Sequence, residues 1–334
     1  MGKAWSSLSS APQFTEKQLA DQSGKVFIVT GSTSGLGRLL VGILYQRNAK
    51  VYIAARSETK AYAAIDEIKR EHPDSTGELV YLHLDLNDLT TIKASANEFL
   101  SKESRLDVLW NNAAVMVPPQ GSKSAQGYEL QIGTNNLAPF LFTELLRPIM
   151  KQTAQTAPKN SVRVIWVSSS AAELAPTPAI DFSNMDYKRE EGIWPKYNRS
   201  KAGNVLHSVE FARRTKGQGI ISLSLNPGFY MTNLQKTMPR LQKTVFVSFT
   251  LRLLNPVKFR SNASASAQRL VTKDPRFGAY TELFAGLHPG IKEEHNGGWI
   301  VPFGNHAPVP AALVDQELGR KYWEWTEEQV RPYR

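Results

Sequence analysis

The chain of 334 residues contains no cysteine. This absence excludes a disulfide scaffold, a thiolate nucleophile and a zinc site with cysteine ligands, and it fits a reducing compartment. The N-terminal segment has no apolar run long enough for a signal peptide. A hydrophobic share of 41% with 21% charged residues excludes a mainly disordered or fibrous chain. We therefore expect a globular, cytoplasmic protein.

Acidic residues are missing from one long stretch. Residues 211–273 carry eleven Lys and Arg and no Asp or Glu, against a net charge of +10 for the whole chain. Such a basic field attracts a phosphorylated cofactor, an anionic substrate or a membrane surface, and a solvated positive face is an equally good interpretation. No recognised nucleic-acid motif accompanies the charge, so we expect no nucleic acid partner.

Long hydrophobic runs are also missing. The longest apolar stretch, Thr244–Leu254, is far shorter than the ~20 residues needed to span a bilayer, and it contains Arg252. We interpret this stretch first as a lid over a lipophilic substrate. The second interpretation is a helix lying on a membrane surface, which would make the protein peripheral to a membrane, and the third is a core element.

No repeat or linker divides the chain, and short β-rich apolar runs alternate with helical patterns. The predicted strands are Val26–Thr30, Val51–Ala55, Leu79–Leu84, Leu106–Trp110, Val162–Ser168 and Ile220–Leu225. The predicted helices are Arg38–Asn48, Thr59–Glu71, Asp88–Ser101, Glu129–Gln152 and Tyr197–Lys216. This alternation predicts an α/β fold, a doubly wound parallel sheet in a single domain over residues 1–334. Residues 24–232 would form its core and 233–334 a less regular extension, with Trp299 in a late strand and Gln316–Val330 as an amphipathic helix.

A glycine-rich turn joins the first predicted strand to the first helix. Its residues are Gly31, Ser32, Thr33, Ser34, Gly35, Leu36 and Gly37. A turn in this place holds a dinucleotide pyrophosphate, because glycines let the backbone approach it and the helix N-terminus supplies N–H groups. We expect all seven residues to contact the cofactor. The alternative is a merely structural turn.

The end of the second predicted strand lacks the Asp or Glu that would accept hydrogen bonds from a ribose 2′-hydroxyl, and Arg56 follows it instead. A guanidinium pairs bidentately with a 2′-phosphate that a carboxylate would repel. The sequence therefore predicts NADP(H), with Arg56 as the main contact and Ser32 or Thr33 assisting. An exposed arginine without this role is the alternative.

Tyr197 and Lys201 are spaced i, i+4, which places them on one face of a predicted helix. A phenol titrates near ~10 in water, and a neighbouring ammonium lowers its pKa toward the operating pH. We therefore expect Tyr197 to donate a proton to a carbonyl oxygen as the general acid.

Together these motifs resemble the short-chain dehydrogenase/reductase family, over about residues 24 to 232. Besides the turn and the Tyr–Lys pair, the family pattern is matched by Asp85, by Asn111 to Ala114, by Asn135, by Ser169 with Ser168 as the other register, by Pro227-Gly228 and by Thr232. The resemblance implies a Rossmann-type fold and further cofactor contacts from Asp85, Leu86, Asn112, Ala113, Tyr197, Lys201, Pro227, Gly228 and Thr232.

The resemblance also implies the catalytic roles. Ser169 and Tyr197 would bind the substrate carbonyl, Lys201 would hold the ribose hydroxyls, and Asn135 would complete a water path. The insert of residues 175–196 is similar to the longer loop of retinol-dehydrogenase-like and fungal-type reductases, and together with Asn233–Arg260 it would wall the substrate cavity.

The resulting hypothesis is an NADPH-dependent reductase of a lipophilic ketone or aldehyde, reversible as an alcohol dehydrogenase. The alternative is a catalytically silent NADP(H)-binding regulatory protein of the same fold. No metal is expected, because His288, His295 and His306 lack the spacing of a zinc site. A homo-oligomer is common in the resembled family, and the sequence does not select its size.

Overall fold

The computed structural model describes residues 11–230 and 274–334. Its sheet has eight strands in the order β3-β2-β1-β4-β5-β6-β7-β8. The strands are β1 Val26–Thr30, β2 Lys50–Ala55, β3 Glu78–His83, β4 Val108–Asn111, β5 Val162–Val167, β6 Ile220–Leu225, β7 Trp299–Val301 and β8 Asn305–Ala307. All neighbours are parallel except β7 and β8. The predicted doubly wound parallel sheet is therefore confirmed.

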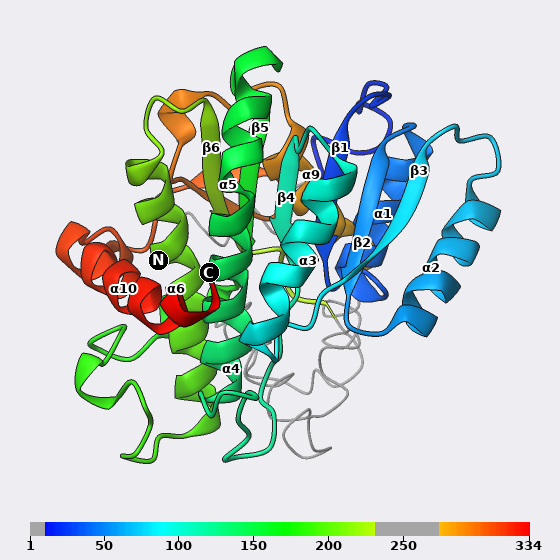
Figure 1. Cartoon of the computed structure of the whole chain (residues 1–334). Helices are drawn as coiled ribbons and strands as arrows, with labels where there is room; N and C mark the ends of the chain where they lie inside the picture. The colour runs from blue at the N-terminus through cyan, green and yellow to red at the C-terminus, as the bar shows by residue number, and fades with distance from the viewer. Residues whose placement is uncertain (1–10, 231–273) are drawn as a thin grey trace, which may run out of the picture.

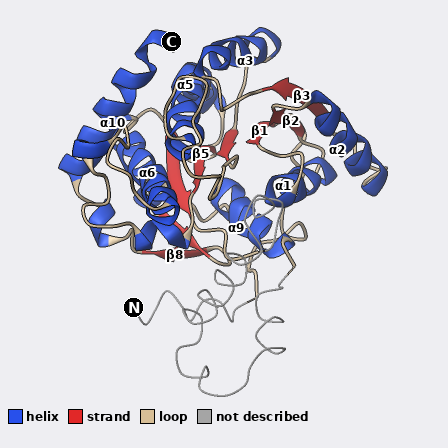
Figure 2. Cartoon of the chain, turned by 90° about the horizontal axis from the view of Figure 1, so that it is seen from below, coloured by secondary structure: helices blue, strands red, loops and turns tan. Residues whose placement is uncertain are grey.

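Helices cover both faces of this sheet (Figures 1 and 2). One face packs against α1 Gly35–Gln46, α2 Glu58–Glu71 and α9 Arg276–Leu287. The other packs against α3 Leu89–Lys102, α5 Ala138–Thr156 and α6 Ile193–Arg214. Because both faces are covered, the central strands are buried along their whole length, and most of their residues are apolar.

Several shorter elements complete the fold. They are α4 Leu130–Ile132, the π-helical η2 Gly133–Leu137, and the 3₁₀ turns η3 Ser170–Leu174, η4 Phe182–Asn184, η6 Glu293–His295, η7 Ala311–Leu313 and η8 Arg331–Tyr333. The helix predicted over Glu129–Gln152 is thus interrupted by a π-helical segment, and the helix predicted from Tyr197 begins four residues earlier. The strand predicted at Trp299 and the helix predicted over Gln316–Val330 (α10) are confirmed.

The C-terminal helix α10 lies outside the second layer, against α6 and α5 (Figure 2). Trp323 is 1% exposed and packs edge-on against Phe140 with ring centroids 4.6 Å apart. Tyr322 is fully buried and stacks on His207 of α6. Tyr322 and Trp323 therefore pack α10 against α5 and α6.

The strand order reverses between β1 and β4, so the chain leaves these neighbouring strands in opposite directions across the sheet. In parallel sheets, ligands bind in the crevice at the carboxyl ends of strands at such a switch point. The glycine-rich turn follows β1, and Asn112 and Ala113 follow β4. The fold thus brings two predicted cofactor segments together.

Candidate active site

The glycine-rich turn is packed directly against the segment after β4. Gly31 has φ +66°, and a Cβ there would lie 2.8 Å from Ala113 Cα. A Cβ on Gly37 would lie 2.5 Å from Asn112 Nδ2. Asn112 Nδ2 donates to Thr30 O at 2.7 Å, and Ala113 N donates to Thr30 Oγ1 at 2.9 Å. Glycine is therefore required where the two segments meet.

The N-terminus of α1 is left open toward an anion. Ser34, at the N-cap, makes no side-chain capping hydrogen bond, and the first turn contains no acidic residue. The first N–H groups of a helix lack partners within it and carry partial positive charge. Together with the glycines, this end of α1 fits the pyrophosphate of a dinucleotide.

Arg56 and Asp85 follow β2 and β3 at the same edge of the sheet. Arg56 is exposed and makes no ion pair within the described part of the chain. Ser32 is fully buried and its hydroxyl donates to Val29 O at 2.7 Å, so Thr33 is the better placed of the two predicted helpers. Asp85 Oδ1 accepts from Asn87 N and shapes the turn after β3, while Leu86 is buried.

Pro227 and Gly228 follow β6, the strand next to β5. Pro227 is buried, and Gly228 has φ +105° with its N–H donating to Asn226 Oδ1 at 3.0 Å. Thr232 and the Thr244–Leu254 stretch fall outside the described residues, as does Asn233–Arg260. Among the helices that the structure describes, none has the length and apolarity to cross a membrane.

Tyr197, Lys201 and Ser169 come together at the carboxyl end of β5. Tyr197 is 4% exposed, and the Ser169 hydroxyl lies near enough to its phenol to lower the pKa of that phenol. Lys201 Nζ lies 5.9 Å from the centre of the Tyr197 ring and donates to Val167 O at 2.9 Å. Ser168, the other register, instead donates its hydroxyl to Lys201 O at 2.7 Å. The geometry thus favours Ser169 as the serine that faces the phenol.

Asn135 lies in the π-helical segment, a feature that is frequent at functional sites. Its Oδ1 accepts from Val115 N at 2.8 Å, and its Nδ2 donates to Val115 O and to Ser200 Oγ, both at 3.0 Å. Ser200 Oγ in turn donates to Tyr197 O. Asn135 therefore ties the segment after β4 to the helix that carries Tyr197.

Burial governs the protonation of the Tyr–Lys pair. It raises the pKa of Tyr197, and the nearby Ser169 hydroxyl opposes this rise only in part. It lowers the pKa of Lys201 to about 7, against the charge of Glu282. The sequence predicts that Lys201 lowers the pKa of Tyr197, but the net direction is upward because desolvation of the phenol dominates.

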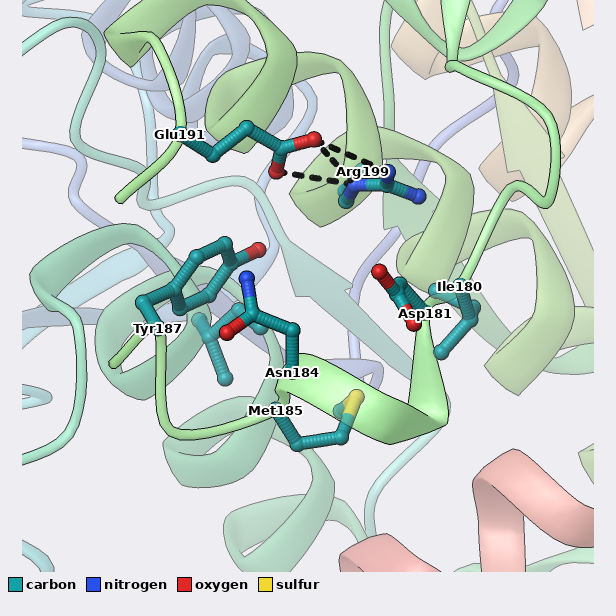
Figure 3. Close-up of a pocket in the computed structure, with 8 residues that line it drawn as sticks. Ile180, Asp181, Asn184, Met185, Tyr187, Glu191 and Arg199 are labelled. Carbon is teal, nitrogen blue, oxygen red and sulfur yellow. Dashed lines mark hydrogen bonds and ion pairs between the residues drawn. The ribbon is translucent and has the colours of Figure 1, made fainter. Parts of the chain in front are cut away.

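Two ion pairs join the loop between β5 and α6 to side chains of α6. Arg199 Nη2 lies 2.9 Å from Glu191 Oε1, and Lys196 Nζ lies 2.7 Å from Glu190 Oε1. Figure 3 shows Arg199 and Glu191 beside a small pocket to which Asn184, Met185 and Tyr187 contribute. This pocket contains none of the predicted catalytic residues. The pairs anchor the insert of residues 175–196 to the helix that carries Tyr197.

Sequence reasoning missed two features of the site. It did not identify these ion pairs, because acids and bases in a polar loop also suit a solvated surface. It also missed α9 and its buried Glu282. The sequence signal that could have revealed this buried acid is its position as the single acidic residue within the otherwise uncharged stretch 278–286.

Comparisons with known proteins agree with this geometry. A family model described as short chain dehydrogenase matches residues 25–242. Short-chain dehydrogenase/reductase pkfC of Emericella nidulans is 51% identical over 329 residues, which is 97% of this chain and 98% of the relative.

Solved structures share the fold. An uncharacterized protein from Mycobacterium paratuberculosis has a TM-score of 0.68 at 24% identity, covering 95% of this chain and 97% of the other. The complex of Pseudomonas aeruginosa RhlG with NADP has a TM-score of 0.62 at 20% identity, covering 85% and 97%. From the family match and the close relative together, this chain belongs to the short-chain dehydrogenase/reductase family of oxidoreductases.

Proposed function

We propose that this protein is an NADPH-dependent reductase of a lipophilic ketone or aldehyde, and that it also catalyses the reverse oxidation of the alcohol. The observation that carries the proposal is that Ser169, Tyr197 and Lys201 meet at the end of β5, with Lys201 Nζ 5.9 Å from the centre of the Tyr197 ring. This group stands at the carboxyl end of the sheet that also bears the glycine-rich turn.

Ser169 and Tyr197 provide two hydroxyl donors for one carbonyl oxygen. Donors fixed before the reaction stabilise negative charge as it develops on that oxygen. The raised pKa of Tyr197 keeps its phenol protonated at neutral pH, which is the form needed to donate a proton during reduction. A bound nicotinamide would supply the hydride. Lys201 would hold the ribose hydroxyls, and Asn135 would complete a water path to solvent.

Preference for NADPH rests on Arg56. Its side chain is exposed at the end of β2, in the place where an NAD site would carry an acid, and is free of ion pairs to the described residues. The guanidinium is thus available to a 2′-phosphate. RhlG, a protein of the same fold, is in complex with NADP.

The lipophilic character of the substrate is supported by the apolar surroundings of Tyr197. Met116, Val117 and Ala171 are buried in one cluster with its ring, and Ile193 and Trp194 pack against that cluster. A carbonyl compound that reaches the phenol would therefore contact hydrocarbon on several sides. Such a site binds an apolar substrate by removing its surface from water.

The test is NADPH consumption over ketones and aldehydes graded by size and polarity, with each product identified. We expect turnover that increases with the apolar surface of the substrate, and formation of the corresponding alcohol. Tight binding of NADPH without oxidation by any member of the panel would contradict the proposal.

A further inference from the structure

Val117, in the segment after β4, has a strained backbone. Its φ is +49°, in the left-handed region, which a β-branched residue rarely adopts. Pro118 follows it, and a proline favours an extended conformation for the residue before it. Such strain persists only where surrounding contacts enforce it, and it is found mainly at functional sites. The contacts that hold Val117 in place therefore bear on the candidate active site.

The side-chain amide of Gln131, in α4, supplies one of these contacts. Gln131 is fully buried, and its Oε1 accepts a hydrogen bond from Val117 N at 3.0 Å. Its Nε2 donates to Glu129 Oε1 at 3.2 Å and to Ile193 O at 3.4 Å. Ile193 is the first residue of α6. One buried amide thus joins the segment after β4 to the start of the helix that carries Tyr197.

A second amide joins the same two segments at the surface. Gln120 Nε2 donates to Glu191 O at 2.9 Å and also to the carboxylate of Glu190. Gln120 lies close to Val117 in the chain, and both acids belong to the end of the insert that leads into α6. The segment after β4 and the end of the insert are therefore joined at two places, one buried and one exposed.

Val117 belongs to the apolar cluster that encloses Tyr197. Its side chain is 3% exposed and is buried together with Met116, Ala171 and the Tyr197 ring. Trp194 packs against this cluster and meets the Tyr197 ring edge-on, with ring centroids 6.3 Å apart. Val117 and Trp194 thus come from the two segments that are joined by the buried amide. A ketone whose carbonyl reaches the phenol would contact these side chains.

We propose that Val117 is a specificity-determining residue of this enzyme, and that Gln131 is the positioning residue that holds it packed beside Tyr197. Held in this way, the Val117 side chain limits the size of the groups that a ketone carries next to its carbonyl. A closely packed apolar wall discriminates between substrates that differ by a methylene group, because its side chains cannot move apart without losing contacts. This inference rests on the proposed function, since it concerns the choice among carbonyl substrates.

The first measurement needs neither cofactor nor substrate. Tetranitromethane nitrates accessible tyrosine rings, and peptide mass spectrometry follows the modification of Tyr197. We expect slow nitration in wild type, where Tyr197 is 4% exposed, and nitration several-fold faster in Val117→Ala. Val330→Ala is the matched control, because it removes the same two methyl groups from a fully buried valine of α10. A wild-type rate in Val117→Ala overturns the proposal.

The second measurement is the reduction of phenyl alkyl ketones from acetophenone to valerophenone, in which only the alkyl group grows. We expect wild type to prefer acetophenone. In Val117→Ala, kcat/KM for valerophenone relative to acetophenone should rise about tenfold or more, mainly through a lower KM for valerophenone. The kcat for acetophenone should stay close to that of wild type, because the hydroxyl donors are unchanged. Val330→Ala should keep the wild-type ratio, and the same ratio in Val117→Ala would contradict the role of Val117.

The role of Gln131 is tested in two backgrounds. Gln131→Met removes the amide and keeps the length of the side chain, and we expect it to raise the valerophenone ratio as Val117→Ala does. Val117→Gly removes both the strain and the side chain, since glycine adopts a positive φ readily, so Gln131→Met should add no further change to it. Equal effects of Gln131→Met in the two backgrounds, or a wild-type ratio, would show that Gln131 does not position Val117. Gln131→Asn, whose shorter side chain draws the amide back, replaces Gln131→Met if the latter does not fold.

Failure of this inference and failure of the proposed function are distinguishable. Wild-type protein that oxidises no NADPH over the full panel of ketones and aldehydes contradicts the proposed function. The nitration rates then still decide whether Gln131 holds Val117 beside Tyr197. Faster nitration in Val117→Ala and Gln131→Met supports that arrangement, and wild-type rates in both variants overturn it.

Discussion

Tyr197 and Lys201 are both enclosed by protein, and burial pushes both toward their neutral forms. For the phenol this favours proton donation, because the acid form persists at neutral pH. For Lys201, burial reduces the positive charge that was expected to lower the pKa of Tyr197. The electrostatic character of the site is therefore set by the groups around the pair as well as by the pair itself.

Arg56 provides the clearest prediction for a single residue. Arg56→Asp would replace a cation by a carboxylate that repels a 2′-phosphate and accepts hydrogen bonds from a 2′-hydroxyl. We expect kcat/KM for NADPH to fall about 100-fold relative to NADH, the size of a lost charge-assisted contact. Steady-state kinetics with both cofactors measure this. Arg70→Asp, the same change on the exposed side of α2, is the control, and an unmoved preference in Arg56→Asp refutes the assignment.

Helix α6 connects the candidate site to both the insert and the C-terminal helix. Tyr197 and Lys201 face the end of β5, Arg199 binds Glu191 of the insert, and His207 contacts Thr326 of α10. The position of the phenol thus depends on contacts along most of this helix. We therefore expect a substitution that breaks the contact with the insert and one that breaks the contact with α10 to have separable effects.

Glu191→Gln tests the connection to the insert. The change leaves the buried guanidinium of Arg199 without its carboxylate, which we expect to cost about 1–3 kcal/mol of stability. If the insert contacts substrate, KM rises several-fold while kcat stays within about twofold of wild type. Kinetics and urea unfolding measure the two effects. Glu324→Gln, which breaks an exposed pair with Arg320, should change neither; equal behaviour of the two variants would contradict the assignment.

His207 tests the connection to α10 through pH. Burial lowers the pKa of His207 to about 3. In the unfolded chain the imidazole takes up its proton near pH ~6.5, so its contribution to stability is fully present above that pH and is lost toward pH 3. The loss is about 1.4 kcal/mol per pH unit in this range.

We therefore expect His207→Phe, which keeps a ring against Tyr322, to lose less stability than wild type between pH 7 and pH 5. Urea unfolding at the two pH values measures the difference. His83→Phe, at an exposed histidine, should behave as wild type. Equal acid sensitivity of wild type and His207→Phe would show that the histidine is not held neutral by burial.

The residues from 274 to 334 complete the fold in three places. Helix α9 covers one face, β7 and β8 extend the edge, and α10 covers α6. The C-terminal part is therefore integral to the core. The basic stretch 211–273 falls largely outside the described residues, and within them Arg213 and Arg214 pair with Glu210.

A substitution at Trp323 tests how much α10 contributes to the free energy of unfolding. Its side chain packs against Phe140 and Phe211 and is 1% exposed. Trp323→Ala should lower the free energy of unfolding by about 3–5 kcal/mol, as expected for a large side chain removed from a core. Chemical denaturation measures it, with the partly buried Trp325→Ala as the control. A loss below 1 kcal/mol would mean that α10 is not part of the cooperative core.

The sequence predicted those parts of the site that depend on residues close to one another in the chain. Gly31 to Gly37 and the Tyr197–Lys201 pair have fixed spacing, and strands such as Val26–Thr30 are mostly apolar because both faces of the sheet are covered. The burial of Glu282 could not be predicted, because it results from the packing of α9 against β4, β5 and β6, which are distant from α9 in the chain. The π-helical segment at Asn135 escaped prediction for a similar reason: its residues fit an ordinary helix, and tertiary contacts with Val115 and Ser200 determine the local turn.

The most direct test of the account is the turnover of Tyr197→Phe, measured as NADPH oxidation with the best carbonyl substrate of the wild type. The variant removes one hydroxyl and keeps the ring, so NADPH should bind as before. Loss of a general acid predicts a fall in kcat of about 100-fold or more. Turnover close to that of wild type would show that the Tyr197 phenol does not deliver the proton and would contradict the central claim.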